Sequence, residues 1–486
     1  MVAPATPPQH HCNLAKFLLP SNSSSSSQHH HHSGIMGFDI PVEILGKQPV
    51  LQIYTQISSI YAVPSPLDRP RISATLRTGL ERLTATFPWI AGQVVDKDTV
   101  NKSGEFHIVP YEQIPQLTVV DRSSGHDSLP SMEEMAAAKF PARMLDEDLI
   151  APEWTLPMLN PKRNADAPFP VFLVQVTFID GGLILTFNTA HTCFDFIGQA
   201  HVQYLLSKAC QGEAFTEDEI REGNRSRHDV VPLLDGSHNL EAVVGHMIKK
   251  PRDGDAAATA QSPPKCTWEY FNFPPQSLEA LKAEASSSIT SGFVSTDDAL
   301  TATVWQAVAR ARAHRLDLTQ PVTLTRAVDS RTSLGVAKEY PGLLQSQIYY
   351  DYRLGDLVSA PVGVVAEKLR AGVNQEQIGY STRAMVTLLN KLEDRSIVSF
   401  IANIDPASAL CISSWAKPDL YSLEFGLGLG KPVSVRRPGF TPVESLAYFA
   451  PKSAEKGIAV MISLREEEMA ALRADKVFTK YAEYVG

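Results

Sequence analysis

The chain has 486 residues, of which 44% are hydrophobic and 20% are charged, and this is the composition of an ordinary soluble globular protein. The formal net charge of -9 argues against a global electrostatic grip on nucleic acid, so any anionic ligand requires a local basic cluster. No apolar run approaches the ~20 residues that a membrane helix needs, so neither nucleic acid nor a membrane is expected as a partner.

The first part of the chain divides into a low-complexity tail and a globular unit. Residues 1–35 contain serine and histidine runs with almost nothing to bury, and we expect them to be disordered. Beyond them, alternating apolar residues predict strands, and apolar residues three or four apart predict helices. The expected strands are 51–57, 93–95, 106–109, 171–178 and 183–187, and the expected helices are 72–87, 132–140 and 197–210.

A polar and charged connection separates this unit from a second one. Residues 212–265 contain two proline-bearing stretches and one helix near 240–249. The strands expected after it are 267–273, 322–328, 343–350, 409–415, 420–425 and 457–464, and the helices are 277–285, one capped by Ser295 and Asp298, 364–373 and 465–481. We therefore expect an α/β fold of mixed α+β sheets, with an N-terminal domain at 36–215, a crossover linker at 216–265 and a C-terminal domain at 266–486.

The stretch 188–198 lies where a buried strand ends and a helix begins. The strand belongs to an apolar hairpin whose turn is expected at 180–182. Histidine titrates near neutral pH, so His191 suits a general base, and Asp195 can cap the following helix or orient a neighbouring group. The same His-x-x-x-Asp spacing is also compatible with a core histidine and a capping aspartate.

Two other chemistries fit this stretch less well. Cys193 lies two residues from His191, a spacing that rarely lets a histidine deprotonate a cysteine, so we interpret Cys193 as pocket wall. A metal site on His191 and Asp195 lacks an obvious third ligand. The chain's five cysteines are scattered without a Cys-x-x-Cys pair, which argues against zinc or a disulfide framework and favours a reducing, cytoplasmic location.

The glycine-rich stretch 424–432 matches neither kind of nucleotide-binding loop. A P-loop requires Ser or Thr after Gly-Lys, whereas Pro432 follows Lys431, and a dinucleotide loop requires a helix to start there. Glycines at these positions allow unusual backbone angles and close packing, which is a structural role.

Together these motifs resemble the BAHD acyltransferases and, within them, the fungal trichothecene 3-O-acetyltransferases. The broad family is marked by His-x-x-x-Asp-Gly midway and by Asp-Phe-Gly-Trp-Gly near the C-terminus. This chain matches at 191–196 and 424–428, with Phe196, Glu424 and Leu427 in place of Gly, Asp and Trp. Stretches similar to the fungal group follow in the same order at 53–57, 88–92, 293–298, 340–345, 413–417, 425–432, 443–446 and 479–486.

The resemblance implies a two-domain fold like that of chloramphenicol acetyltransferase, with a solvent channel between the domains. Acetyl-CoA would enter as co-substrate from one face and a small-molecule alcohol acceptor from the other, without a metal. His191 would be the catalytic base, and Asp195 would turn away from the substrate to pair with Arg331. The other assigned positions are structural support at Glu424, Gly426 and Gly428, and CoA contacts at Ser295, Thr296 and Lys417.

The expected activity is transfer of an acetyl group from acetyl-CoA to a hydroxyl of a hydrophobic polycyclic metabolite, most closely a trichothecene C-3 hydroxyl. One alternative is a BAHD-like enzyme that uses another acyl-CoA and another fungal alcohol or amine. A second is a catalytically silent ligand-binding protein of the same fold. A peptide-synthetase condensation domain fits less well, because Ala190 stands where that family has a second histidine. The protein is expected to be a monomer.

Overall fold

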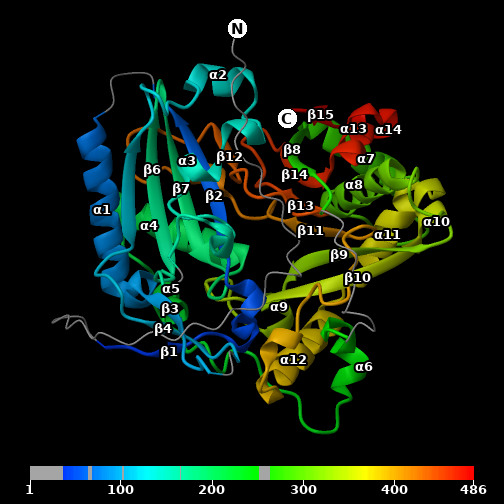
Figure 1. Cartoon of the computed structure of the whole chain (residues 1–486), viewed down its shortest axis with the longest axis horizontal. Coiled ribbons are helices and arrows are strands. Elements are labelled where there is room, and N and C mark those ends of the chain that lie inside the picture. The colour runs from blue at the N-terminus through cyan, green and yellow to red at the C-terminus, as the bar shows by residue number, and fades with distance from the viewer. Residues whose placement is uncertain (1–36, 64–67, 101–102, 165, 251–262) are drawn as a thin grey trace.

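The computed structural model of the chain describes residues 37–63, 68–100, 103–164, 166–250 and 263–486. The expected disordered tail at 1–35 and part of the connection at 251–262 lie outside these residues. Within the described residues the strands form three sheets, which Figure 1 shows with the first half of the chain on the left and the second half on the right. No helix in the described segments is both long and apolar enough to cross a membrane.

A five-stranded sheet belongs mainly to the first half of the chain. Its strands, in spatial order, are β12 (Ser434–Arg436), β2 (Tyr54–Ala62), β7 (Gly182–Ala190), β6 (Phe172–Ile179) and β5 (Gln116–Asp121). β6 and β7 form the expected hairpin, and Gly181 takes a φ of 70° in its turn, a backbone angle that suits glycine. The helices α1 (Arg69–Thr86) and α4 (Phe196–Gln211) pack on this sheet and on each other through a shared apolar core.

A seven-stranded sheet organises the second half. Its spatial order is β10 (Gln345–Arg353), β9 (Pro321–Asp329), β11 (Leu410–Ser414), β13 (Leu446–Phe449), β14 (Ile458–Arg465), β8 (Cys266–Phe273) and β15 (Glu483–Tyr484). Its apolar core includes side chains of the helices α7 (Pro275–Ser286), α8 (Thr296–Arg312), α10 (Leu354–Ser359), α11 (Val362–Gly372), α13 (Glu466–Ala474) and α14 (Lys476–Thr479). The expected capping box of α8 is present, because Ser295 and Asp298 bond each other's backbone N–H groups.

Smaller elements fill the space around the two large sheets. The third sheet consists of β1 (Ile40–Pro41), β4 (Phe106–Val109) and β3 (Gln93–Asp96). The remaining helices are α2 (Met132–Ala137), α3 (Glu147–Ile150), α5 (Glu217–Gly223), α6 (Leu240–Val244), α9 (Arg331–Leu334) and α12 (Gln375–Lys391). The mixed sheets and helices confirm the expected fold class.

Two expected elements differ in the structure. Residues 420–425 are not a strand: a short 3-10 turn, Leu420–Ser422, is followed by Phe425 with a φ of 52°. The closing helix at 465–481 is interrupted, because Asp475 ends α13 and its side chain accepts a hydrogen bond from the N–H of Val477 at the start of α14.

One strand crosses between the two halves of the chain. β12 comes from the second half, yet it pairs antiparallel with β2 of the five-stranded sheet, from Ser434 opposite Ile60 to Arg436 opposite Ser58. Figure 1 shows it beside β2. The domain limits at 215 and 265 remain a prediction, and this crossover ties the second proposed domain to the sheet of the first.

Candidate active site

His191 follows the last residue of β7 and opens into a cavity of about 530 Å³. Its backbone N–H donates to the carbonyl of Ile53, which fixes the loop to the strand pair β2–β7. The ring Nδ1 lies 2.7 Å from the carbonyl oxygen of Phe194. A carbonyl can only accept, so Nδ1 carries the proton and the lone pair is on Nε2.

The surroundings keep the imidazole neutral. Burial lowers the pKa of His191 below its usual value, because a charged ring would lose its hydration. The Phe194 carbonyl and the Asp195 carboxylate oppose this effect, and the guanidinium of Arg437 reinforces it. A neutral imidazole with a free Nε2 is the form in which histidine accepts a proton.

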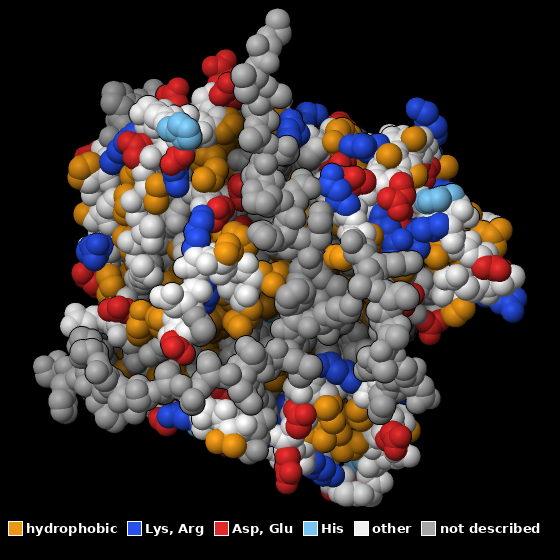
Figure 2. Space-filling model, in the orientation of Figure 1, with side chains coloured by type: hydrophobic (Ala, Val, Ile, Leu, Met, Phe, Trp, Pro, Cys, Tyr) orange, Lys and Arg blue, Asp and Glu red, His pale blue; other side chains and the backbone are white. Residues whose placement is uncertain are grey.

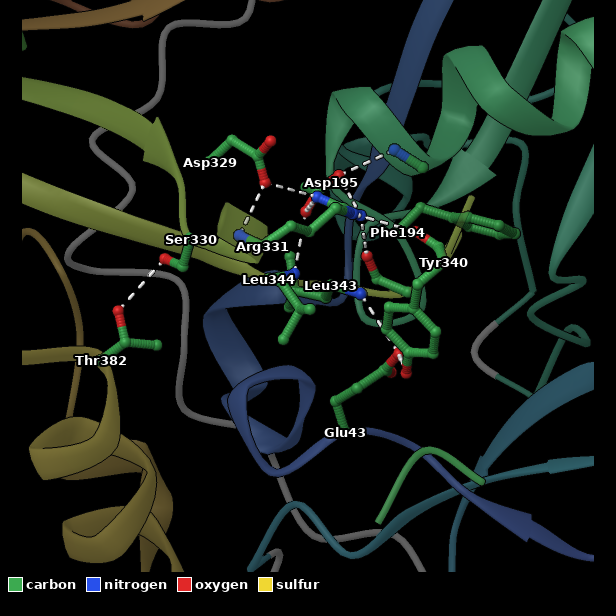
Figure 3. A network of polar contacts seen from close by, with 12 residues as sticks. Glu43, Phe194, Asp195, Asp329, Ser330, Arg331, Tyr340, Leu343, Leu344 and Thr382 are labelled. Atoms are coloured by element: carbon green, nitrogen blue, oxygen red, sulfur yellow. Dashed lines mark hydrogen bonds and ion pairs between the residues drawn. The ribbon is translucent and has the colours of Figure 1, made fainter. Parts of the chain in front are cut away.

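Asp195 is fixed beneath this loop by hydrogen bonds. As the N-cap of α4, its carboxylate accepts from the backbone N–H of Gly198 at 2.8 Å. The two terminal nitrogens of Arg331, Nη1 and Nη2, donate to the same carboxylate at 2.8 and 3.0 Å, and the N–H of Leu344 adds a further bond. The expected contact between Asp195 and Arg331 is therefore present, and Figure 3 shows it.

Arg331 is in turn saturated by oxygen acceptors. Besides Asp195, it donates to the carbonyls of Tyr340 and Gly342 and to the carboxylate of Asp329. Its side chain is 2% exposed, so these bonds replace the water that the guanidinium has lost. The loop around Pro341 packs directly on the start of α4, because a Cβ at Gly198 would lie 1.8 Å from the Pro341 carbonyl oxygen.

A second buried ion pair supports the same loop, and the sequence did not reveal it. Arg227, in the segment expected to be a linker, donates to the Glu43 carboxylate at 2.7 Å and to the Cys193 carbonyl at 3.1 Å. The Tyr340 hydroxyl donates to the same Glu43 carboxylate, as Figure 3 shows. Because the Tyr340 carbonyl accepts from Arg331, this tyrosine links the two ion pairs. The available signal was a charged residue, Glu43, inside an apolar run.

Cys193 faces away from chemistry. Its side chain is fully buried in the apolar core, and burial raises the pKa of its thiol to about 12. A thiol that stays protonated is a poor nucleophile. The expectation that Cys193 forms pocket wall is wrong, because it packs behind the loop and does not border either cavity. Across the described residues, no group of three His, Cys, Asp or Glu side chains could hold a metal ion.

A second and larger cavity, of about 710 Å³, lies next to the first. Of the three expected CoA contacts, Thr296 and Lys417 border it, whereas Ser295 does not border it and its hydroxyl bonds the Asp298 carboxylate. Four lysines border this cavity without an ion pair to any described residue: Lys417, Lys431, Lys452 and Lys456. These lysines form a local basic cluster at the cavity. Figure 2 shows charges of both signs interspersed on the described part of one face of the molecule.

Acidic residues near the start of α8 are compensated. Arg326 donates to the carboxylates of both Asp297 and Asp298. By themselves, the two negative charges would repel an anion bound at the N-terminus of α8. The positive charge of Arg326 offsets most of this repulsion.

The two cavities meet at an aromatic stack. Phe196, Ala327, Gln345, Ser413 and Trp415 border both of them. The rings of Phe196 and Trp415 lie 4.1 Å apart and 6° from parallel. His191 borders only the smaller of the two, which is mostly apolar.

The glycine motif packs away from His191, against the far end of α4. The Phe425 ring stacks on Phe187, and its backbone N–H donates to the Ser207 hydroxyl. Gly426 and Gly428 have φ angles of 62° and 74°, and the side chain of Glu424 is exposed. A supporting role of this motif in packing remains our proposal.

The chain matches two families of known proteins. Residues 144–479 match the Transferase family, and residues 53–210 match the trichothecene 3-O-acetyltransferase-like N-terminal domain. It is 44% identical to the trichothecene 3-O-acetyltransferase TRI101 of Fusarium sporotrichioides, over 92% of this chain and 98% of that protein. The chain belongs to the trichothecene 3-O-acetyltransferase-like family of transferases. It is an acyltransferase, as the motifs predicted.

Solved structures of this family share its fold. The structure of F. sporotrichioides TRI101 complexed with coenzyme A and T-2 has a TM-score of 0.85 at 43% identity, covering 92% of this chain and 100% of that one. The structure of F. graminearum TRI101 complexed with ethyl coenzyme A has a TM-score of 0.88 at 41% identity, covering 93% and 100%. Vinorine synthase, at 15% identity over 93% of this chain and 95% of its own, has a TM-score of 0.65 and shows the fold alone.

Proposed function

We propose that this acyltransferase moves the acetyl group of acetyl-CoA to the C-3 hydroxyl of a trichothecene. The observation that carries the proposal is the free Nε2 of His191 at an apolar cavity that adjoins a basic one. Relatives at 40–43% identity were solved with coenzyme A together with T-2 or deoxynivalenol, which supports both substrate classes.

In this mechanism both substrates meet at His191 in one complex. Nε2 takes the hydroxyl proton as the acceptor oxygen attacks the thioester carbonyl. The tetrahedral intermediate then collapses, the carbon–sulfur bond breaks, and the imidazolium returns the proton to the departing CoA sulfur. Asp195 and Arg331 hold the loop so that Nδ1 stays bonded to the Phe194 carbonyl and Nε2 stays available.

The larger cavity is the proposed entry for acetyl-CoA. Its unpaired lysines and Thr296 at the start of α8 suit phosphate groups, which bind cations and helix N-termini. Lys417 is the proposed contact beside Trp415. The hydroxyl and the backbone N–H of Ser295 both donate to the Asp298 carboxylate, so its proposed role is to hold the start of α8.

The direct test is mass spectrometry of T-2 toxin or deoxynivalenol incubated with the protein and acetyl-CoA. We expect a mass increase of one acetyl group on the C-3 oxygen, dependent on His191. If the wild-type protein leaves both alcohols unchanged while it releases CoA with another alcohol, the acceptor assignment is wrong and the acyltransferase assignment stands.

A second candidate acceptor class has its own support. The chain is 45% identical to the O-acetyltransferase dmxR13 of Cryptosporiopsis, over 92% of this chain and 97% of that protein. This identity is within one percentage point of that to TRI101, so another fungal alcohol or amine with another acyl-CoA is the alternative. A panel of CoA thioesters and acceptors, assayed by CoA release, separates the two. A ligand-binding protein without catalysis would release no CoA with any of them.

The cellular setting is also part of the proposal. The four described cysteines, Cys193, Cys210, Cys266 and Cys411, are free thiols, which suits a reducing compartment such as the cytoplasm. We propose that the protein acts there as a monomer, and size-exclusion chromatography with light scattering tests the oligomeric state.

A further inference from the structure

Arg437 is a buried cation on the wall of the His191 cavity. Its side chain is 3% exposed and follows β12 directly. The guanidinium carbon lies 4.4 Å from the ring centre of Phe440, 4.5 Å from that of Tyr448 and 5.3 Å from that of Trp415. All four residues border the cavity, so three aromatic rings hold the guanidinium in place at the edge of the space that the acceptor would occupy.

This guanidinium lacks the partners that a buried arginine requires. Among the described residues its Nε has no hydrogen-bond partner, and the one bond that its side chain makes is a long one, 3.4 Å, to the Thr155 hydroxyl. No carboxylate of the described chain forms an ion pair with it. The positive charge of Arg437 lowers the pKa of the nearby Glu147, but the Glu147 carboxylate accepts its hydrogen bonds from the Gln56 amide and the Thr155 N–H instead. Burying an unpaired charge costs free energy. A ligand that accepts hydrogen bonds from this guanidinium removes part of that cost, and this adds to its binding free energy.

Arg437 also lies on one side of the reaction only. It borders the smaller cavity and not the larger, basic one, so its position fits the acceptor rather than the acyl-CoA. The rest of that cavity is largely apolar, and a few fixed polar groups in such a cavity determine the orientation of a ligand.

On the basis of the proposed function, we propose that Arg437 binds a hydrogen-bond-accepting oxygen of the acceptor, distinct from the hydroxyl that is acylated. The acceptor is then a polycyclic alcohol with two polar points: the hydroxyl that meets His191 and a carbonyl, ether or carboxylate oxygen that meets the guanidinium. These two points orient the apolar body between them. An alcohol without the second oxygen would leave the charge unpaired and would bind more weakly.

The test compares Arg437→Met, Arg437→Lys and Arg436→Met in steady-state kinetics with deoxynivalenol and acetyl-CoA. Arg436 is a matched control because it is also buried and without a carboxylate partner among the described residues, yet it borders neither cavity. We expect Arg437→Met to raise KM for the acceptor by about 10- to 100-fold, the effect of a lost charge-assisted hydrogen bond. KM for acetyl-CoA should stay within about threefold, Arg437→Lys should recover part of the loss, and Arg436→Met should change neither KM.

Three results would overturn the proposal. The first is an unchanged acceptor KM in Arg437→Met, and the second is an equal rise of both KM values together with a lowered Tm, which indicates a structural role. The third is an equal loss for an acceptor and for its analogue lacking one oxygen, tested at each oxygen in turn. Failure of the proposed function is distinct, because wild type would then leave deoxynivalenol unacetylated; the same three variants are in that case compared on the alcohol that the acceptor panel identifies.

Discussion

Two buried arginines near His191 differ in how fully they are paired. Arg331 and Arg437 are 2% and 3% exposed, respectively. Arg331 donates to two carboxylates and two backbone carbonyls, whereas Arg437 makes one long hydrogen bond and is otherwise surrounded by aromatic rings. All five N–H donors of the first are used, whereas the second uses one of its donors in bonds to the described residues.

This difference separates the residues that hold the site from those that meet the substrate. A saturated guanidinium contributes to the stability of one loop conformation, and its removal leaves buried carboxylates uncompensated. An unsaturated one costs stability until a ligand completes it, a common feature of functional sites. His191 combines both features, because it is bonded to the loop through Nδ1 and borders the cavity that Arg437 also borders.

The largest effect on activity is expected from removal of the His191 imidazole. His191→Ala should lower kcat by about 10²–10⁴, because a positioned general base contributes that much. Thermal unfolding should be little changed, since the ring is at a cavity wall. Measurement of CoA release under saturating substrates checks this, and full turnover by the alanine variant would end the catalytic assignment.

Removal of Arg331, which holds the loop, should mainly lower the stability of the protein. Arg331→Met should lower the free energy of unfolding by about 3–5 kcal/mol, because Asp195 would be left buried without its counter-ion. Urea unfolding of Arg331→Met, Asp195→Asn and the double variant measures the coupling between them. A double variant whose loss equals the sum of the single losses would contradict a direct energetic link.

Loss of the second buried ion pair, between Arg227 and Glu43, should also lower the free energy of unfolding, but by less. Arg227→Met removes charge-assisted bonds to Glu43 and to the Cys193 carbonyl, and it should cost about 1.5–3 kcal/mol in unfolding free energy together with a lower kcat. Arg225→Met, in the same segment, is the control: its ion pair is partly exposed and should contribute less than ~1 kcal/mol. Equal effects of the two variants would remove Arg227 from the supporting network.

The smallest effect concerns pH. The folded protein lowers the pKa of His191, so the imidazole stays neutral at pH values below the usual pKa of histidine. The rate therefore falls only as the pH drops through the lowered pKa. Arg437→Met removes one cause of this lowering, so the acid limb of kcat/KM should move to higher pH. Asp195 acts oppositely on His191, and Asp195→Asn should move the same limb to lower pH. Shifts in the same direction for both variants would contradict this electrostatic account.

Local patterns predicted the elements that position His191, but not the contacts that support it. The β6–β7 hairpin, the start of α4 and the Ser295 capping box follow from alternation, turn residues and cap spacing. The Asp195–Arg331 pair came from a motif match alone. The contact of Arg227 with Glu43 spans residues 184 apart in sequence, and no local signal specifies such a partner.

The same limit applies to short or polar elements. β12 is three residues long and exists because the edge of β2 accepts it, so its own sequence carries too little pattern to predict it. α12 was not expected because its apolar stripe is interrupted by polar residues. It is nevertheless amphipathic, and its buried residues Ala384, Met385, Val386 and Leu389 pack into a separate apolar cluster.

The crossing strand bears on how the two halves can be handled as parts. A fragment ending near residue 250 would contain β2 without β12, and its backbone N–H and C=O groups opposite residues 434–436 would lose their partners. Such a fragment would expose an unpaired strand edge, which can pair with the same edge of another copy and cause self-association. Swapping one half between relatives would also bring in a foreign β12, so a viable chimera has to exchange β2 and β12 as a matched pair.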